Sequence, residues 1–206
     1  MKILIVSAST KPNGTTNRAV QEAEKRLMKL GCEITVFNLF SERIYSCSGC
    51  NLCKNDNHCK LADYASEILE AAPEFDGYIF FTPVHYGCAS GNLISFLERL
   101  FYSKKEFLKY KPAAAVAISR RGGNLTALES ITRFFSFNSM PTVNGNYPGI
   151  IHGTTQDELA EDKEGLQTIR SIADNVVWLI KCIEEGKKSG KYPPNQEVKI
   201  KTNYIR

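Results

Sequence analysis

The sequence lacks the long apolar runs and the dense basic arms of membrane proteins and nucleic-acid-binding proteins. It contains no run of about 18 apolar residues, the length that a membrane helix needs. The net charge is only +4, and no block of like charges precedes residue 187, so we expect neither a membrane nor a nucleic acid as partner. The N-terminal apolar run, Ile3 to Val6, is too short for an export signal, and we therefore expect a cytoplasmic protein.

Three motifs of nucleotide and phosphate chemistry are also missing. Without G-x-x-x-x-G-K-[ST], the chain does not match the P-loop nucleotide hydrolases. Without G-x-G-x-x-G after the first predicted strand, a tightly bound dinucleotide has no support. No cysteine is followed by an arginine six residues later, as the small cysteine phosphatases of this topology require. A mononucleotide remains as the ligand.

Apolar runs that are typical of strands alternate with helical patterns along the chain. Strands are predicted at 2–7, 34–39, 77–82, 113–118 and 142–146, and helices at 16–30, 63–72, 90–102, 124–135 and 156–185. This alternation implies right-handed crossovers. The sequence therefore predicts an α/β fold, a doubly wound five-stranded parallel sheet with helices on both faces. We expect one domain at 1–186, with a cysteine-rich insertion at 47–59 and a basic extension at 187–206.

The loop after the first predicted strand, SASTKPNGTTN (residues 7–17), is rich in hydroxyl side chains and opens into a helix. A helix N-terminus presents free N–H groups and a partial positive charge, and hydroxyls add donors for phosphate oxygens. We therefore assign a phosphate-binding role to Ser9, Thr15, Thr16 and Asn17. Alternatively, the loop is only an N-cap cluster in which Thr16 or Thr15 starts the helix.

The loop after the third predicted strand, TPVHYGCASGN (residues 82–92), combines flat side chains with glycines. His85 and Tyr86 offer ring faces, and Gly87 lets the backbone approach a ligand closely. We predict that a planar heterocycle lies against Pro83, Val84, His85, Tyr86 and Gly87. Alternatively, the aromatic side chains only cover the core.

The loop after the fourth predicted strand, SRRGGN (residues 119–124), repeats this combination of polar and small residues. Its candidates for contact with a bound ring are Ser119, Arg120, Gly122 and Gly123. An arginine here could stabilise negative charge that develops on a ring during reduction. Arg120 and Arg121 could equally be solvated surface residues.

Four of the seven cysteines lie close together with the spacing C-x2-C-x2-C-x5-C. Three thiolates at the C-x2-C-x2-C pitch can bind three corners of a cubane iron–sulfur cluster, whereas zinc sites more often use two separated pairs. The candidate metal ligands are Cys47, Cys50, Cys53 and Cys59, with free thiols and zinc as the alternatives. The other three cysteines are predicted to be buried small residues: Cys32, Cys88 and Cys182.

The chain resembles the flavodoxin-like NAD(P)H-dependent FMN reductases in four segments. These are ILIVSASTKPNGTTN, CSGCNLCKNDNHC, GYIFFTPVHYGCASGNLISFLERL and, last, HG with EDKEGLQTIRSIADNVVWL. The cysteine segment is similar to that of the iron–sulfur flavoproteins within the family. The resemblance implies that the first loop binds the FMN phosphate, that the second and third loops contact the isoalloxazine ring, and that the cysteines hold a [4Fe–4S] cluster. Family members usually carry a tyrosine followed by an aromatic residue where this chain has His85 and Tyr86, which leaves the stacking residue open.

The same resemblance implies an oxidoreductase. NAD(P)H would act as a transient co-substrate that reduces FMN, and the electrons would pass to a small acceptor such as a flavin or quinone, or to a redox protein. The flavin supplies the chemistry, so no catalytic side chain is assigned. A homodimer or homotetramer is also expected. Two alternatives are a one-electron carrier without a small substrate and a non-catalytic member that binds zinc.

Overall fold

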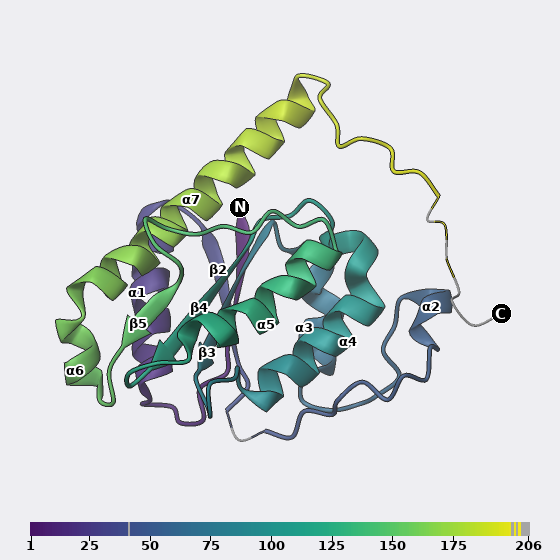
Figure 1. Cartoon of the computed structure of the whole chain (residues 1–206). Coiled ribbons are helices and arrows are strands. Elements are labelled where there is room, and N and C mark those ends of the chain that lie inside the picture. Colours follow the sequence, from purple (N-terminus) through teal and green to yellow (C-terminus); the bar gives the residue numbers. More distant parts are fainter. Residues whose placement is uncertain (41, 199, 201, 203–206) are drawn as a thin grey trace.

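The computed structural model describes residues 1–40, 42–198, 200 and 202. Its centre is a parallel sheet with the strand order β2-β1-β3-β4-β5 (Figure 1). The strands are β1 (Lys2–Ser7), β2 (Glu33–Asn38), β3 (Gly77–Pro83), β4 (Ala113–Ser119) and β5 (Ile150–His152). Because β1 pairs with both β2 and β3, the order reverses at β1, and flavodoxin-like folds bind ligands beside that point. The predicted doubly wound parallel sheet of five strands is confirmed.

Helices cover both faces of the sheet (Figure 1). One face carries α1 (Thr15–Lys29), α6 (Gln156–Glu161) and α7 (Lys163–Lys188). The other carries α3 (Ser66–Ala71), α4 (Gly91–Leu108) and α5 (Asn124–Phe137). Two short elements are α2 (Cys53–Asp56) and the 3₁₀ helix η1 (Ala72–Glu74). The described residues contain no helix that is long and apolar enough to cross a membrane.

Alternate residues of the buried strands supply the two cores between these layers. In β1, Leu4 and Val6 belong to the core beneath α4 and α5, whereas Ile3 and Ile5 belong to the core beneath α1 and α7. Successive side chains of a strand point to opposite faces, so a strand covered on both faces must be apolar throughout. This requirement explains the continuous apolar run of β1.

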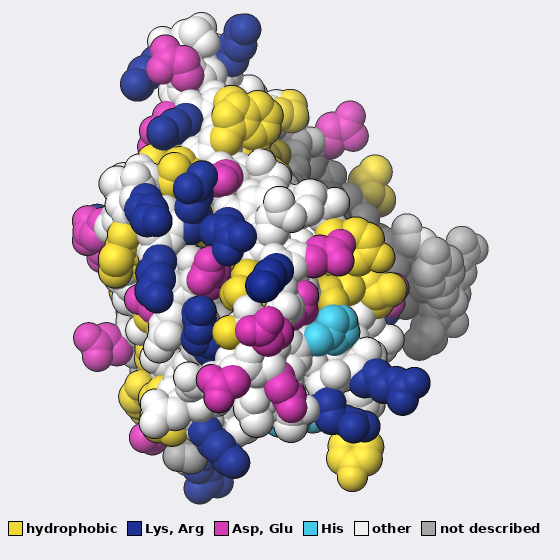
Figure 2. Space-filling view, turned by 90° about the vertical axis from the view of Figure 1, so that its left-hand side faces the viewer, with side chains coloured by type: hydrophobic (Ala, Val, Ile, Leu, Met, Phe, Trp, Pro, Cys, Tyr) yellow, Lys and Arg dark blue, Asp and Glu magenta, His cyan; other side chains and the backbone are white. Residues whose placement is uncertain are grey.

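The outer surface of α1 and α7 is polar and is crossed by ion pairs. Arg26 of α1 binds Asp174 of α7 with an N–O distance of 2.7 Å, and Arg170 of α7 binds Glu22 of α1 at 2.6 Å. Figure 2 shows basic and acidic side chains interleaved over this face. Positive and negative charges therefore alternate on this side of the molecule.

Two predicted elements differ from the structure. The fifth strand lies at Ile150–His152 and not at 142–146, where Thr142 makes only an isolated bridge to Ala113. The reason is steric, because a Cβ at Gly149 would lie 2.1 Å from the carbonyl oxygen of Ala115. This glycine lets the chain pack against the backbone of β4 just before β5 pairs with Ala117, Ile118 and Ser119. The predicted helix at 156–185 is two helices, since Asp162 ends α6 and caps α7 by accepting the Gly165 N–H.

The first two residues of the predicted basic extension, 187–206, belong to α7. α7 ends at Lys188, and the described residues after it are exposed. The side chain of Gln196 donates a hydrogen bond to the Ser139 hydroxyl, with an N–O distance of 3.2 Å. Two lysines of the extension, Lys199 and Lys201, lie outside the described residues.

Candidate functional site

The structure brings the three predicted ligand loops to one edge of the sheet. The Ala8 N–H donates to the Phe81 carbonyl at 2.9 Å, which joins the first loop to β3. The second and third loops pack backbone to backbone, because a Cβ on Gly123 would lie 2.7 Å from the Cα of Gly87. Parallel strands end at the same edge, so loops that are far apart in sequence meet there.

The first loop leads into α1, and no side chain caps the N–H groups at the N-terminus of this helix. The N-cap residue is Gly14, which has no side chain to cap the helix, and no acidic residue occurs in the first turn. Thr15 is the first residue of α1 and Thr16 the second, which agrees with the alternative that they start the helix, although neither side chain caps it. Uncapped N–H groups and the helix dipole together form an anion site.

The side chains predicted to bind phosphate divide into two groups. Ser9 donates its hydroxyl to the Lys11 carbonyl at 2.6 Å, and Asn17 accepts the hydroxyl of Ser7 at 2.7 Å. These two side chains hold the shape of the loop. Thr15 and Thr16 stand in the first turn, and the Thr16 side chain is buried. The contribution of Ser7 was not predicted from the sequence.

The second loop makes a tight turn. His85 and Cys88 exchange two backbone hydrogen bonds of 2.9 Å, with positive φ angles of 49° at Tyr86 and 77° at Gly87. Positive φ at both central residues is typical of a type I′ turn, which favours glycine at the second position. Tyr86 is fully exposed, so the alternative in which it covers the core is wrong. Pro83 and Val84 are half-buried at the end of β3.

The third loop is fixed by a buried hydrogen-bond network. The Ser119 hydroxyl donates to the side-chain oxygen of Asn124 at 2.7 Å, and the Asn124 amide donates to the Ala117 carbonyl at 2.8 Å. The Nδ1 of His152 lies 3.3 Å from the same hydroxyl. No site role was predicted for Asn124 or His152, although Asn124 follows the double glycine directly.

The flanking residues of the third loop face solvent. Arg120 and Arg121 are both exposed, as is Gly122. Gly123 precedes α5 as its N-cap residue with φ 88°. Glu158 of α6 lies near Arg120, and its pKa is held below the ordinary value, first by the Thr154 N–H and to a smaller degree by the Arg120 charge.

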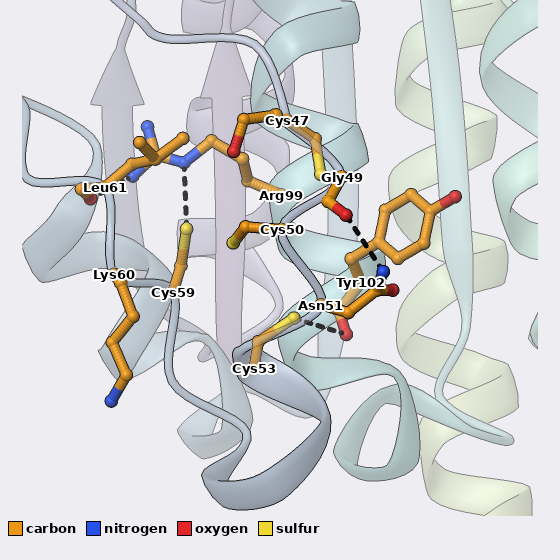
Figure 3. Close-up of a pocket in the computed structure, with 11 residues that line it drawn as sticks. Cys47, Gly49, Cys50, Asn51, Cys53, Cys59, Lys60, Leu61, Arg99 and Tyr102 are labelled. Carbon is orange, nitrogen blue, oxygen red and sulfur yellow. Dashed lines mark hydrogen bonds between the residues drawn. The ribbon is translucent and has the colours of Figure 1, made fainter.

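All four clustered cysteines line one cavity, which we call the cysteine pocket. Figure 3 shows their side chains around a common space that Arg99 and Tyr102 of α4 help to close. Cys50 is exposed, and the other three are half-buried. Burial, followed by the nearness of Cys59, Cys47 and Cys50, raises the pKa of the Cys53 thiol. The Leu52 N–H and then the Ser48 hydroxyl lower the pKa of Cys50.

One face of α4 supports the segment that carries these cysteines. Asn92 donates to the Glu42 carbonyl at 3.4 Å, Ser95 shares a hydrogen bond of 2.9 Å with Ser46, and Glu98 accepts the Cys47 N–H at 3.4 Å. One turn further, the Tyr102 carbonyl accepts the Cys53 thiol at 3.5 Å. Residues three or four apart share a helix face, so this polar stripe beside the apolar stripe of α4 is a feature that the sequence contained.

The two ends of the cysteine segment are joined by Asp63. Its carboxylate accepts the Tyr45 N–H at 2.7 Å and the Ala65 N–H at 3.0 Å, and it forms an ion pair with Arg99. The side chains of Arg99 and Asp63 are 0% and 4% exposed, respectively. Neither residue was predicted to be functional, because a charged residue in a helix or loop is usually solvated.

The three isolated cysteines are not buried, contrary to the prediction. Cys88 and Cys182 are exposed, and Cys32 is half-buried. Cys88 stands in the exposed turn of the second loop. Cys182 lies near the outer end of α7, beyond the last buried residue of that helix, Ile180. Position in the fold decided their exposure more than the apolar character of the thiol.

The four cysteines line one cavity but do not converge on one point. Among the described residues, no three cysteine, histidine or carboxylate side chains converge closely enough for one metal ion. A single tetrahedral zinc ion needs all its sulfurs within about 2.3 Å. A cubane cluster binds each thiolate at a different iron corner, so its ligands stand further apart around one space. Four thiols that line one cavity supply the number and kind of ligands that such a cluster needs.

Known proteins with a similar sequence identify the family of this chain. The family model for NADPH-dependent FMN reductase matches residues 1–155. The chain belongs to this family. An iron–sulfur flavoprotein of Methanocaldococcus jannaschii is 33% identical over 193 residues, covering 90% of this chain and all of the relative. An iron–sulfur flavoprotein of Methanosarcina thermophila is 26% identical over 191 residues, covering 91% and 99%.

Solved structures agree with this family in fold. RosB, determined with bound 8-demethyl-8-formylriboflavin-5'-phosphate, matches with a TM-score of 0.71 at 15% identity, covering 100% of this chain and 92% of RosB. A WrbA-like flavodoxin of Agrobacterium tumefaciens matches with a TM-score of 0.61 at 13% identity, covering 87% and 98%. At this level of identity the likeness concerns the fold alone. The family that the sequence segments indicated is confirmed.

Proposed function

We propose that this FMN reductase family member is an oxidoreductase that binds FMN, takes electrons from NADH or NADPH, and passes them to a small acceptor such as a flavin or quinone. The observation that carries the proposal is the meeting of three loops beside the strand reversal at β1. FMN, when bound, supplies hydride and single-electron chemistry. The chain itself contributes position and hydrogen bonds.

The residues at this edge fit FMN in two respects. The uncapped N-terminus of α1, with Thr15 and Thr16 in its first turn, offers N–H and hydroxyl donors to a phosphate. The type I′ turn at Tyr86 and Gly87 and the close packing of Gly123 expose backbone rather than bulky side chains to a flat ring. These features support binding of the phosphate at one end and of the ring at the other.

We also propose that the cysteine pocket holds a [4Fe–4S] cluster. The ligands would be Cys47, Cys50, Cys53 and Cys59. Two observations support this: the four thiols line one cavity, and the relatives that match almost the whole chain are named iron–sulfur flavoproteins. A cluster, when bound, supplies one-electron transfer. The chain's part is to hold four thiolates along the flank of α4 and to shield three of them partly from solvent.

The first experiment is an absorption spectrum of protein purified without oxygen, with iron, acid-labile sulfide and FMN measured on the same sample. About four irons per chain together with flavin would support both proposals. Flavin without iron would overturn the cluster and retain the FMN proposal, and a colourless protein would overturn both. A Cys50→Ser variant should lose iron and keep FMN, whereas Cys182→Ser should keep both and serves as the matched control.

The second experiment separates an enzyme from an electron carrier. Steady-state oxidation of NADH and of NADPH is measured with free FMN and with a quinone as acceptors. Turnover with either nucleotide supports the proposed reductase. A protein that contains FMN and iron, and whose flavin neither nucleotide reduces, would instead be a one-electron carrier that exchanges electrons with a redox protein. Light scattering of the same sample checks the predicted homodimer or homotetramer.

A further inference from the structure

Arg99 is a cation buried beside the cysteine pocket. Its side chain is 0% exposed and belongs to α4, the helix that supports the cysteine segment. The Nε–H donates to the sulfur of Cys59 at 3.3 Å, and another N–H donates to the Leu61 carbonyl at 2.7 Å. A third nitrogen forms the ion pair with Asp63. Figure 3 shows the bond from Arg99 to Cys59 at the wall of the cavity.

The geometry of the guanidinium assigns different tasks to its nitrogens. Asp63 already compensates the buried charge, and the Tyr45 and Ala65 N–H groups hold that carboxylate in place. The guanidinium is a rigid planar fork, so fixing two of its nitrogens also fixes the direction of the Nε–H. That direction is toward Cys59. The bond to the sulfur is therefore oriented by contacts that lie outside the cysteine pocket.

Hydrogen bonds and charges near the sulfurs set the reduction potential of an iron–sulfur cluster. Reduction by one electron makes the cluster with its four thiolates one unit more negative, and it forms or breaks no bond in the chain. A fixed cation that donates a hydrogen bond to a ligand sulfur stabilises the more negative state. Such a group raises the reduction potential relative to the same pocket without it.

We propose that Arg99 is a positioning residue that orients Cys59 and raises the reduction potential of the cluster in the cysteine pocket. This inference rests on the proposed cluster and goes beyond it, because it assigns control of the potential to a residue outside the ligand set. Asp63 acts in the opposite sense, because its negative charge compensates the guanidinium.

The test is a redox titration of the holoprotein without oxygen, with the reduced cluster followed by electron paramagnetic resonance. Arg99→Met should lower the potential, since both the charge and the donor are lost. A tenfold change in the ratio of reduced to oxidised cluster corresponds to about 59 mV for one electron, and we expect a shift of at least this size. Asp63→Asn should raise the potential, because the guanidinium loses its compensating charge.

The opposite signs separate this proposal from a purely structural role. If Arg99 only clamps residues 61–63, both substitutions loosen the same contact, and the two potentials would move in the same direction or not at all. Either result would overturn the inference. Lys104→Met is the matched control, since Lys104 is a second buried cation of α4, pairs with Glu70 at 2.5 Å and does not line the cysteine pocket. Its potential should stay near that of the unsubstituted protein.

Two further results complete the test. If Arg99→Met does not retain iron, the potential is measured in Arg99→Lys instead, because this variant keeps the positive charge and loses only the planar guanidinium. Its potential should fall by less than the tenfold equivalent, and an unchanged potential would overturn the inference. Iron and FMN are measured on every sample. A protein without iron before any substitution would overturn the proposed cluster and this inference together, whereas normal iron with unshifted potentials would overturn the inference alone.

Discussion

Replacing Asp63 by asparagine should destabilise the protein strongly, although the side chain keeps its size and loses only its negative charge. Asp63 and Arg99 form an ion pair in which the side chains are 4% and 0% exposed. Removing one partner of a buried pair leaves an uncompensated charge, which costs about 3–5 kcal/mol. The Tyr45 and Ala65 N–H groups donate to different carboxylate oxygens, so asparagine can keep only one of these two hydrogen bonds, and we expect a loss of about 3 kcal/mol or more.

This loss should be visible in both thermal and chemical unfolding. For a chain of this length, 1 kcal/mol shifts the melting temperature by about 2–4 °C, so Asp63→Asn should melt about 6–12 °C lower. The double variant with Arg99→Met removes both charges and should lose less free energy of unfolding than the sum of the single variants. A loss below about 1 kcal/mol in Asp63→Asn, or additive losses in the double variant, would refute the idea that this pair stabilises the cysteine segment.

Three further predictions concern the loop edge. Gly123→Ala combines a positive φ of 88° with a Cβ 2.7 Å from the Cα of Gly87, and it should cost about 1–3 kcal/mol in unfolding experiments and weaken FMN binding measured by fluorescence. Thr16→Val keeps the volume of a buried residue and removes its hydroxyl, so the FMN dissociation constant should rise about tenfold or more without a change in melting temperature. Hydrogen bonds from Thr154 and Thr155 hold the pKa of Glu158 below its ordinary value, so its stabilising contribution is present above that ordinary value and disappears as pH falls through the lowered one. Glu158→Gln should remove this part of the pH dependence when unfolding is followed from about pH 6 to 3; an unchanged slope would contradict it.

The fold could be predicted because parallel strands covered on both faces must be apolar, and the central residues of β1, β3 and β4 satisfy this rule. The fifth strand could not be located, since it has only three residues and its position depends on the contact of Gly149 with the Ala115 backbone. That contact joins two segments distant in sequence. Local patterns contain no information about it.

Part of the candidate site could be predicted from the sequence, and part of it could not. The three ligand loops could be predicted together because they follow strands of one parallel sheet. Arg99 could not, because its role depends on Cys59, which lies forty residues earlier and reaches α4 only through tertiary structure. Its three bonds arise from one planar group, and sequence spacing does not show the direction of a side chain. For the same reason the exposure of Cys88 and Cys182 was predicted wrongly.

α4 begins directly after the loop that we expect to lie against the FMN ring and carries Arg99 and Tyr102 at the cysteine pocket. From Gly91 to Arg99 the helix rises about 12 Å. This rise sets the separation, along the helix axis, between the start of α4 and the cysteine pocket. Each residue added to a helix rotates all the later residues by about 100° around the axis. One residue inserted between these positions would therefore swing Arg99 and Tyr102 away from the cysteines. The length of this short stretch is therefore constrained in a protein that uses both regions.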